Sequence, residues 1–102
     1  MTDYAFHNVT RIQVDALREC IDFIRNGYVD MTNYYDEHEW YLYFKKADAN
    51  RRIKVIVRPF SYVIEKNGKV VKSVEGVPDD CRYNVSFDSD VIIKADLVSS
   101  CR

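Results

Sequence analysis

The sequence predicts an α+β fold in which one N-terminal helix packs on a curved antiparallel sheet of β-hairpins, in the order β-α-β-meander. Three observations lead to this fold class. One stretch has apolar residues at helical spacing, and after it apolar and polar residues alternate with a period of two. The loops that follow have lengths that place apolar residues of neighbouring strands on one face. At 102 residues the chain has room for one hydrophobic core, so we expect a single domain over residues 1–102.

A strand and the helix come first in the chain. Residues 6–14 favour a strand, and Asp15 is expected to cap the helix because its carboxylate can accept hydrogen bonds from backbone N–H groups of the next turn. Gly27 is expected to end the helix in a left-handed conformation. The spacing of three and four residues predicts a buried stripe of Leu17, Cys20, Ile21, Ile24 and Tyr28.

The first hairpin is predicted within residues 40–57. A four-residue loop, 47–50, places residue 46 opposite residue 51. The pairs on one face are then all apolar: Trp40 with Val57, Leu42 with Val55, and Phe44 with Ile53. The opposite face holds Lys45 beside Arg52, Tyr43 beside Lys54, and Tyr41 beside Ile56, with Arg58 further along.

The second hairpin has the strongest local signal, Asn67-Gly68, because both central residues of a type I′ turn need positive φ. This turn pairs Ile64 with Val71. Neither face of the hairpin is cleanly apolar, so we expect it to lie at an edge of the sheet or to project from it. Residues 75–80 are expected to form a loop because they include Gly76 and Pro78.

The third hairpin is predicted around a three-residue loop, 88–90, which pairs Phe87 with Val91, Val85 with Ile93, and Tyr83 with Ala95. Together the helix and the hairpins predict which side chains form the core. They are Leu17, Ile21, Ile24, Trp40, Leu42, Phe44, Ile53, Val55, Val57, Val85, Phe87 and Ile93.

Charge is distributed unevenly along the chain, although its formal sum is only −1. Residues 41–72 contain nine Lys or Arg and two acidic residues, whereas residues 1–40 contain three Lys or Arg and eight acidic residues. Residues 73–102 are acidic as well, with six acidic and three basic side chains. A basic middle therefore lies between two acidic flanks.

The sequence gives no positive support for an enzyme. Residues 36–39 (Asp-Glu-His-Glu) include carboxylates and an imidazole, but on a strand at most two of these ligands share a face, so a solvated turn is favoured over a metal site. The three glycines do not form a phosphate-binding loop, and Cys20 falls on the buried helix stripe as an inert thiol. We expect no catalytic residue, metal or cofactor.

The odd number of cysteines, Cys20, Cys81 and Cys101, indicates neither a disulfide framework nor a zinc site and favours a reduced, cytoplasmic setting. The first residues do not combine a basic stretch with an apolar run, and no window is apolar enough to span a membrane. We therefore expect neither secretion nor membrane insertion.

The candidate binding surface is the polar face of the first hairpin, formed by Tyr41, Tyr43, Lys45, Arg52, Lys54 and Arg58. Like charges directly opposite each other destabilise a sheet, so Lys45 beside Arg52 calls for an anion. One source of this anion is an acidic side chain of the same chain, since both flanks supply many. The other source is a binding partner.

The leading hypothesis is a non-enzymatic protein-binding module, an inhibitor or adaptor of the kind that phages and mobile elements carry. It would dock this face, or the Asn67-Gly68 hairpin, onto a larger protein with an acidic patch. The alternative is a single-stranded nucleic-acid-binding domain that uses the same face, with tyrosines stacking on bases. A weaker third reading is a small metal-dependent enzyme at residues 36–39. The sequence leaves the oligomeric state open.

Overall fold

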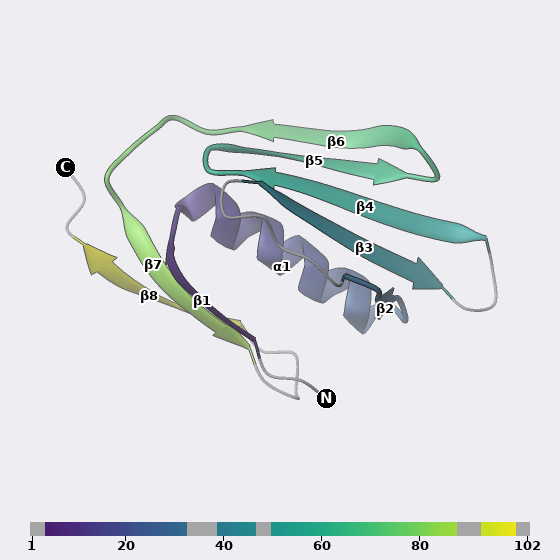
Figure 1. Ribbon diagram of the computed structural model, residues 1–102, viewed down its shortest axis with the longest axis horizontal. Coiled ribbons are helices and arrows are strands. Elements are labelled where there is room, and N and C mark those ends of the chain that lie inside the picture. Colours follow the sequence, from purple (N-terminus) through teal and green to yellow (C-terminus); the bar gives the residue numbers. More distant parts are fainter. Residues whose placement is uncertain (1–3, 33–38, 47–49, 88–92, 100–102) are drawn as a thin grey trace.

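The computed structural model describes residues 4–32, 39–46, 50–87 and 93–99 of the chain. Within these ranges the chain forms one helix and eight strands (Figure 1). In chain order they are β1 (Tyr4–Val9), α1 (Arg11–Arg25), β2 (Val29–Asp30), β3 (Trp40–Lys46), β4 (Arg51–Arg58), β5 (Ser61–Lys66), β6 (Lys69–Glu75), β7 (Arg82–Phe87) and β8 (Ile93–Ser99).

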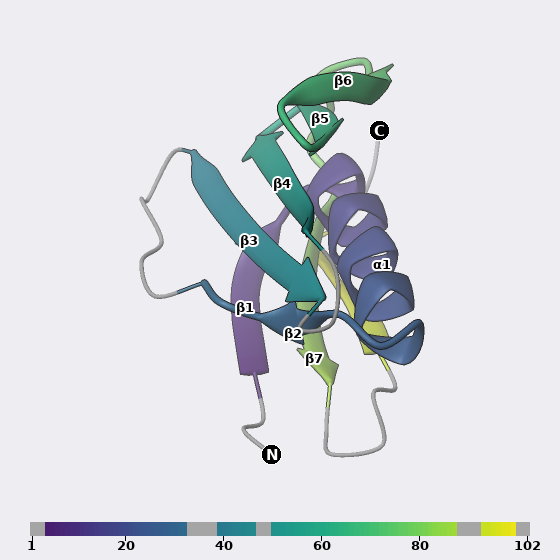
Figure 2. The same ribbon diagram turned by 90° about the vertical axis from the view of Figure 1, so that its right-hand side faces the viewer.

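The strands form two antiparallel sheets, a five-stranded sheet of order β2-β3-β4-β5-β6 and a three-stranded sheet of order β1-β7-β8. Helix α1 contacts both sheets, and Figure 2 shows it along one face of the five-stranded sheet. The predicted α+β fold with its N-terminal helix is therefore confirmed, but the strands are divided between two sheets. The division arises because β7 pairs with β1 and not with β6, after a loop that contains Gly76 and Pro78.

The helix begins at Arg11, so the predicted start at Asp15 is wrong. Thr10 caps the helix: its hydroxyl accepts a hydrogen bond from the Gln13 N–H at 3.2 Å, and the Gln13 side chain accepts one from the Thr10 N–H at 2.8 Å. This reciprocal pair is a capping box, which the spacing Thr-x-x-Gln signals in the sequence. The preceding strand accordingly ends at Val9 and not at Val14.

Replacing Thr10 with valine is expected to lower the free energy of unfolding by about 1–2 kcal/mol, as for other lost N-caps. The effect should fall in the upper part of this range, because the buried Thr10 hydroxyl also donates to the carbonyl of Pro59, which would lose its donor. Urea unfolding measures the change. Thr10→Ser keeps the hydroxyl and is the matched control; an equal loss in both variants would contradict this role.

The helix ends as predicted, with Asn26 as the C-cap and Gly27 at φ 93°. Most of the predicted core is confirmed, since Leu17, Ile21, Trp40, Leu42, Phe44, Ile53, Val55, Val57 and Val85 are all buried. Ile24 is only half-buried and packs at the margin of this core. The side chains of Phe87 and Ile93 lie outside those that the structure describes.

The register of the first hairpin is confirmed at every predicted pair, from Trp40 opposite Val57 to Lys46 opposite Arg51. Inward residues of β3 and β4 are buried, and the residues between them are exposed or half-buried. Residues 47–49 of the predicted loop lie outside the described residues. This register decides which side chains share the outward face.

The second hairpin has the predicted turn but a different register. Asn67 and Gly68 have φ values of 51° and 83°, as a type I′ turn requires, and Lys66 lies opposite Lys69. A bulge between Ile64 and Glu65 then inserts one extra residue in β6, so Ile64 faces Lys72 and not Val71. Of the two strands of this hairpin, β6 lies at an edge of the sheet, whereas β5 pairs with β4 as well.

The register of the third hairpin differs from the prediction by two residues. Phe87 lies opposite Ile93, Val85 opposite Ala95, and Tyr83 opposite Leu97. The predicted loop, residues 88–90, lies outside the described residues. Because side chains alternate with a period of two, a shift of two residues changes the partners but keeps each side chain on its predicted face.

The helix is tied to edge strand β6 through Glu19. Lys72 Nζ lies 2.5 Å from Glu19 Oε2, and the Tyr62 hydroxyl donates to the same oxygen at 2.9 Å. Hydrogen bonding to Glu19 raises the pKa of Lys72, while burial and then this hydrogen bond raise the pKa of Tyr62. Because both pKa values are raised in the folded state, each group stabilises the fold fully at pH values below its ordinary pKa. This stabilisation is lost as the pH rises through the folded-state pKa.

Candidate functional site

The structure places all the predicted binding residues on β3 and β4, on the outward face of the five-stranded sheet. The alternation of the strands puts Leu42, Phe44 and Val55 on the inner face against the helix, so the residues between them point away from the core. Tyr43, Lys45, Arg52 and Arg58 are exposed, whereas Tyr41 and Lys54 are half-buried. Helix α1 lies on the inner face of this sheet.

One end of this face is neutralised by the chain itself. Arg58 Nε and Nη2 lie 3.2 and 3.4 Å from the two carboxylate oxygens of Glu39, and the Tyr41 hydroxyl donates to the same carboxylate. The hydrogen bond to Glu39 raises the pKa of Tyr41. Glu39 therefore neutralises the charge of Arg58 and binds the hydroxyl of Tyr41. At this end of the face the anion is an acidic side chain of the same chain, which is the first of the two sources considered from the sequence. Extending the predicted register by one pair, to Glu39 opposite Arg58, would have indicated this contact.

The ammonium group of Lys54, in the middle of the surface, lies over the rings of two tyrosines. Its Nζ lies 5.4 Å from the ring centre of Tyr41 and 5.9 Å from that of Tyr43, within the range of cation–π interactions. Glu65 lies opposite Lys54 in the β4–β5 register, but no ion pair joins the two. Two tyrosine rings are thus engaged by an ammonium group of the same chain.

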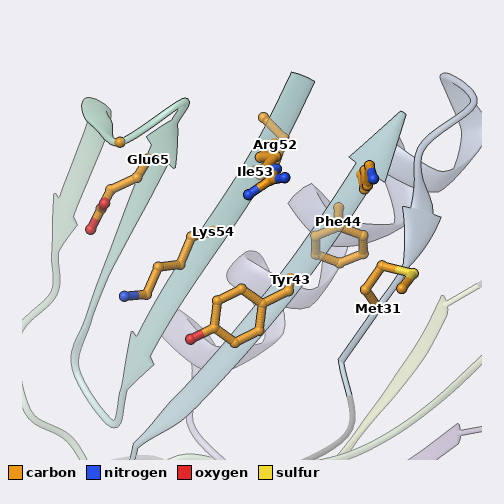
Figure 3. A pocket seen from close by; sticks show the side chains of 9 residues that line it. Met31, Tyr43, Phe44, Arg52, Ile53, Lys54 and Glu65 are labelled. Carbon is orange, nitrogen blue, oxygen red and sulfur yellow. The ribbon is translucent and has the colours of Figure 1, made fainter. Parts of the chain in front are cut away.

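The other end of the face forms a groove of about 380 Å³. Figure 3 shows Tyr43, Arg52 and Lys54 on β3 and β4, with Met31 on one side and Glu65 of β5 on the other. Among the described residues, no carboxylate forms an ion pair with Lys45, Arg52 or Lys54. The groove is lined by Met31, Tyr43, Phe44, Lys45, Arg52, Ile53, Lys54, Glu65 and Gly68.

Two neighbouring segments complete this groove. The Asn67-Gly68 turn is held to β4, because the Asn67 side chain accepts from the Arg52 N–H and the Asn67 N–H donates to the Arg52 carbonyl, both at 2.9 Å. On the other side, the Met31 N–H donates to the Tyr43 carbonyl at 2.7 Å, and Met31 is 56% exposed. The groove is therefore basic in its centre and apolar at the β2 end.

Sequence reasoning found the basic centre and missed the borders. Met31, Glu65 and Gly68 come from elements whose pairing with β3 and β4 the sequence did not predict. The Asn67-Gly68 turn was singled out, but only as a separate hairpin. The bulge-free pairing of β5 with β4 is what brings this turn beside Arg52.

The described residues do not bring together any group of three His, Cys, Asp or Glu side chains that could hold a metal ion. Of the 36–39 cluster only Glu39 is described, and it binds Arg58 and Tyr41; residues 36–38 lie outside the described residues. Cys20 is a buried free thiol whose pKa is raised well above its ordinary value by burial.

The cysteines differ from the expectation in one respect. Cys81 is buried and disulfide-bonded, so the expected reduced state is wrong for this residue, and the inference of a cytoplasmic setting loses that support. Spacing alone could not show this, because the fold can join cysteines that are distant in sequence. Cys101 lies outside the described residues.

Comparison with protein families, curated proteins and solved structures gave no match. In the part of the chain that the structure describes, no helix is both long and apolar enough to cross a membrane. The functional argument therefore depends on the geometry of the groove and its surroundings.

Proposed function

We propose that the chain is a non-enzymatic protein-binding module that docks an acidic, partly apolar surface of a larger protein in the groove between β2 and β5. The supporting observation is the set of three cations, Lys45, Arg52 and Lys54, which border the groove without an ion-pair partner among the described residues. Such a module would act as an inhibitor or adaptor, since binding alone suffices for either role.

The mixed chemistry of the groove favours a protein over other anions. A carboxylate placed between Lys45 and Arg52 would relieve the repulsion of two like charges that lie directly opposite each other. Met31 and Tyr43 add exposed apolar and aromatic area beside these charges. Methionine, tyrosine and arginine are enriched at protein–protein interfaces, where charge complementarity speeds association and selects the partner.

The same geometry argues against single-stranded nucleic acid. Base stacking needs free aromatic faces, whereas Lys54 lies over both Tyr41 and Tyr43. A phosphate backbone that follows the sheet would also meet Glu39 at one end and Glu65 at the side of the groove. These carboxylates reduce the continuous positive potential on which backbone binding depends.

The test is a pull-down from source lysate treated with nuclease, with the variant Arg52→Glu/Lys54→Glu beside the wild type. The variant is expected to release the protein partner, because it places negative charges against the partner's acidic surface. Arg18→Glu/Arg25→Glu changes the net charge equally on exposed helix positions and is the matched control, expected to keep the partner.

An oligonucleotide titration on the same proteins completes the design. If the proposal holds, oligonucleotides should bind no more tightly than the roughly 10⁻⁴ to 10⁻⁶ M of non-specific association. Sub-micromolar binding with a steep salt dependence would overturn it in favour of a nucleic-acid partner. A charge-reversed variant that retains every protein captured by the wild type would exclude this groove as the docking surface.

A further inference from the structure

Strand β8 is an open edge of the three-stranded sheet. It pairs with β7 on one side, and no described strand pairs with its other side (Figure 1). The pairing of β8 with β7 is regular from Ile93 to Leu97, and its only irregularity lies beyond Leu97. An edge strand of this kind presents unpaired N–H and C=O groups to which another strand can add.

The charges of β8 are complementary to those of a second β8. Lys94 lies opposite Ser86 and Asp96 opposite Asn84, so both charged side chains are on one face, and both are exposed. Neither forms an ion pair with any described residue of its own chain. The alternate residues, Ala95 and Leu97, share the other face, and Leu97 is 55% exposed.

We propose that β8 pairs in antiparallel orientation with β8 of a second copy of this chain, around a two-fold axis at Ala95. In this register Lys94 of each copy lies opposite Asp96 of the other, which forms two equivalent cross-strand ion pairs. In the same register, Leu97 of each copy lies opposite Ile93 of the other. The two three-stranded sheets become one continuous sheet with an isologous interface.

Registers shifted by one or two residues would not place Lys94 opposite Asp96. A shift of one residue would place the charged face of one copy against the apolar face of the other. A shift of two residues would bring Lys94 opposite Lys94, or Asp96 opposite Asp96, and like charges directly opposite each other are destabilising. Among the registers that keep the faces together, the one centred on Ala95 joins opposite charges.

Strand β6, one of the two edges of the larger sheet, is less suited to the addition of another strand. The bulge between Ile64 and Glu65 interrupts its regular alternation, and Lys72 is already bound to Glu19. A bulge within an edge strand opposes the addition of another strand, whereas the irregularity of β8 lies beyond its Lys94–Asp96 segment. The contrast between these two of the edge strands favours β8 over β6 for self-association. This proposal is independent of the groove on the five-stranded sheet.

Analytical ultracentrifugation over a wide concentration range tests the proposal on the full chain. The wild type is expected to show a concentration-dependent monomer–dimer equilibrium. Lys94→Asp and Asp96→Lys each replace two attractive pairs with two repulsive ones, so each should weaken dimerisation by about tenfold or more. Both sites are exposed opposite neutral residues, and circular dichroism verifies that each variant remains folded.

Charge-swap rescue makes the test specific for the register. The double variant Lys94→Asp/Asp96→Lys should recover the wild-type dimer, because each introduced carboxylate again faces an introduced ammonium group. An equimolar mixture of the two single variants should form a heterodimer although neither variant dimerises well alone. A wild type that stays monomeric at every concentration, single variants that dimerise as tightly as wild type, or a double variant without rescue would each overturn the proposal.

Discussion

Replacing Phe44 with alanine is expected to lower the free energy of unfolding by about 3–5 kcal/mol, because the loss of buried apolar surface and the cavity left behind add together. Phe44 is 3% exposed, and its ring centre lies 5.8 Å from that of Phe23 on the helix. Truncation therefore removes a contact between the five-stranded sheet and α1. Chemical denaturation monitored by circular dichroism measures the loss.

Tyr43→Ala is the matched control for this prediction. Tyr43 precedes Phe44 on the same strand but points to the outward face and is 43% exposed. Its truncation is expected to reduce stability by only about 1 kcal/mol, as for other exposed cross-strand contacts. If Tyr43→Ala proved the more damaging change, the inner and outer faces of β3 would have to be exchanged.

The second large effect is expected from Val85→Asp. Val85 is 1% exposed on β7, the central strand of the three-stranded sheet, where it packs in the same core as Val14 and Leu17 of the helix. An unpaired carboxylate buried here should destabilise the fold by about 3–5 kcal/mol at neutral pH. Thermal unfolding at several pH values measures this penalty.

The pH dependence identifies the charge as the cause. Burial raises the pKa of the introduced carboxyl in the folded state above its ordinary value of about 3.9, so the unfolded state is favoured at higher pH. The difference in stability from Val85→Asn should therefore shrink as the pH falls through the folded-state pKa toward this ordinary value. A difference that does not vary with pH would indicate that shape, and not charge, determines the loss.

The first hairpin shows what the sequence could predict. Its strands alternate cleanly, and its loop length fixes the register, so the inner core and the outward face followed together. The helix start was missed because Ile12 and Val14 extend the alternation of the preceding strand through the capping box of Thr10 and Gln13. In that segment two local signals overlapped, and the hydrogen bonds of the cap prevailed.

The borders of the groove could not be predicted for a different reason. Met31 and Glu65 belong to strands that reach β3 and β4 only through pairings between hairpins, and no loop length specifies those pairings. The register of the second hairpin depended on a bulge. The register of the third hairpin depended on a connection longer than the predicted three residues. Local turn chemistry therefore predicted the faces of the first and third hairpins, whereas the bulge in β6 and the contacts between separate hairpins required the assembled sheet.

The pairing of β1 with β7 has a consequence for the order in which the chain can fold. From β2 to β6, every strand of the larger sheet pairs with its neighbour in sequence, so each step closes a short loop. Strand β1 instead pairs through Phe6 with Val85, across almost the whole described chain. Contacts between such distant residues slow folding, and during synthesis β1 is made first but must wait for β7. We therefore expect the addition of β1 to complete the smaller sheet late, after the helix and the larger sheet have formed.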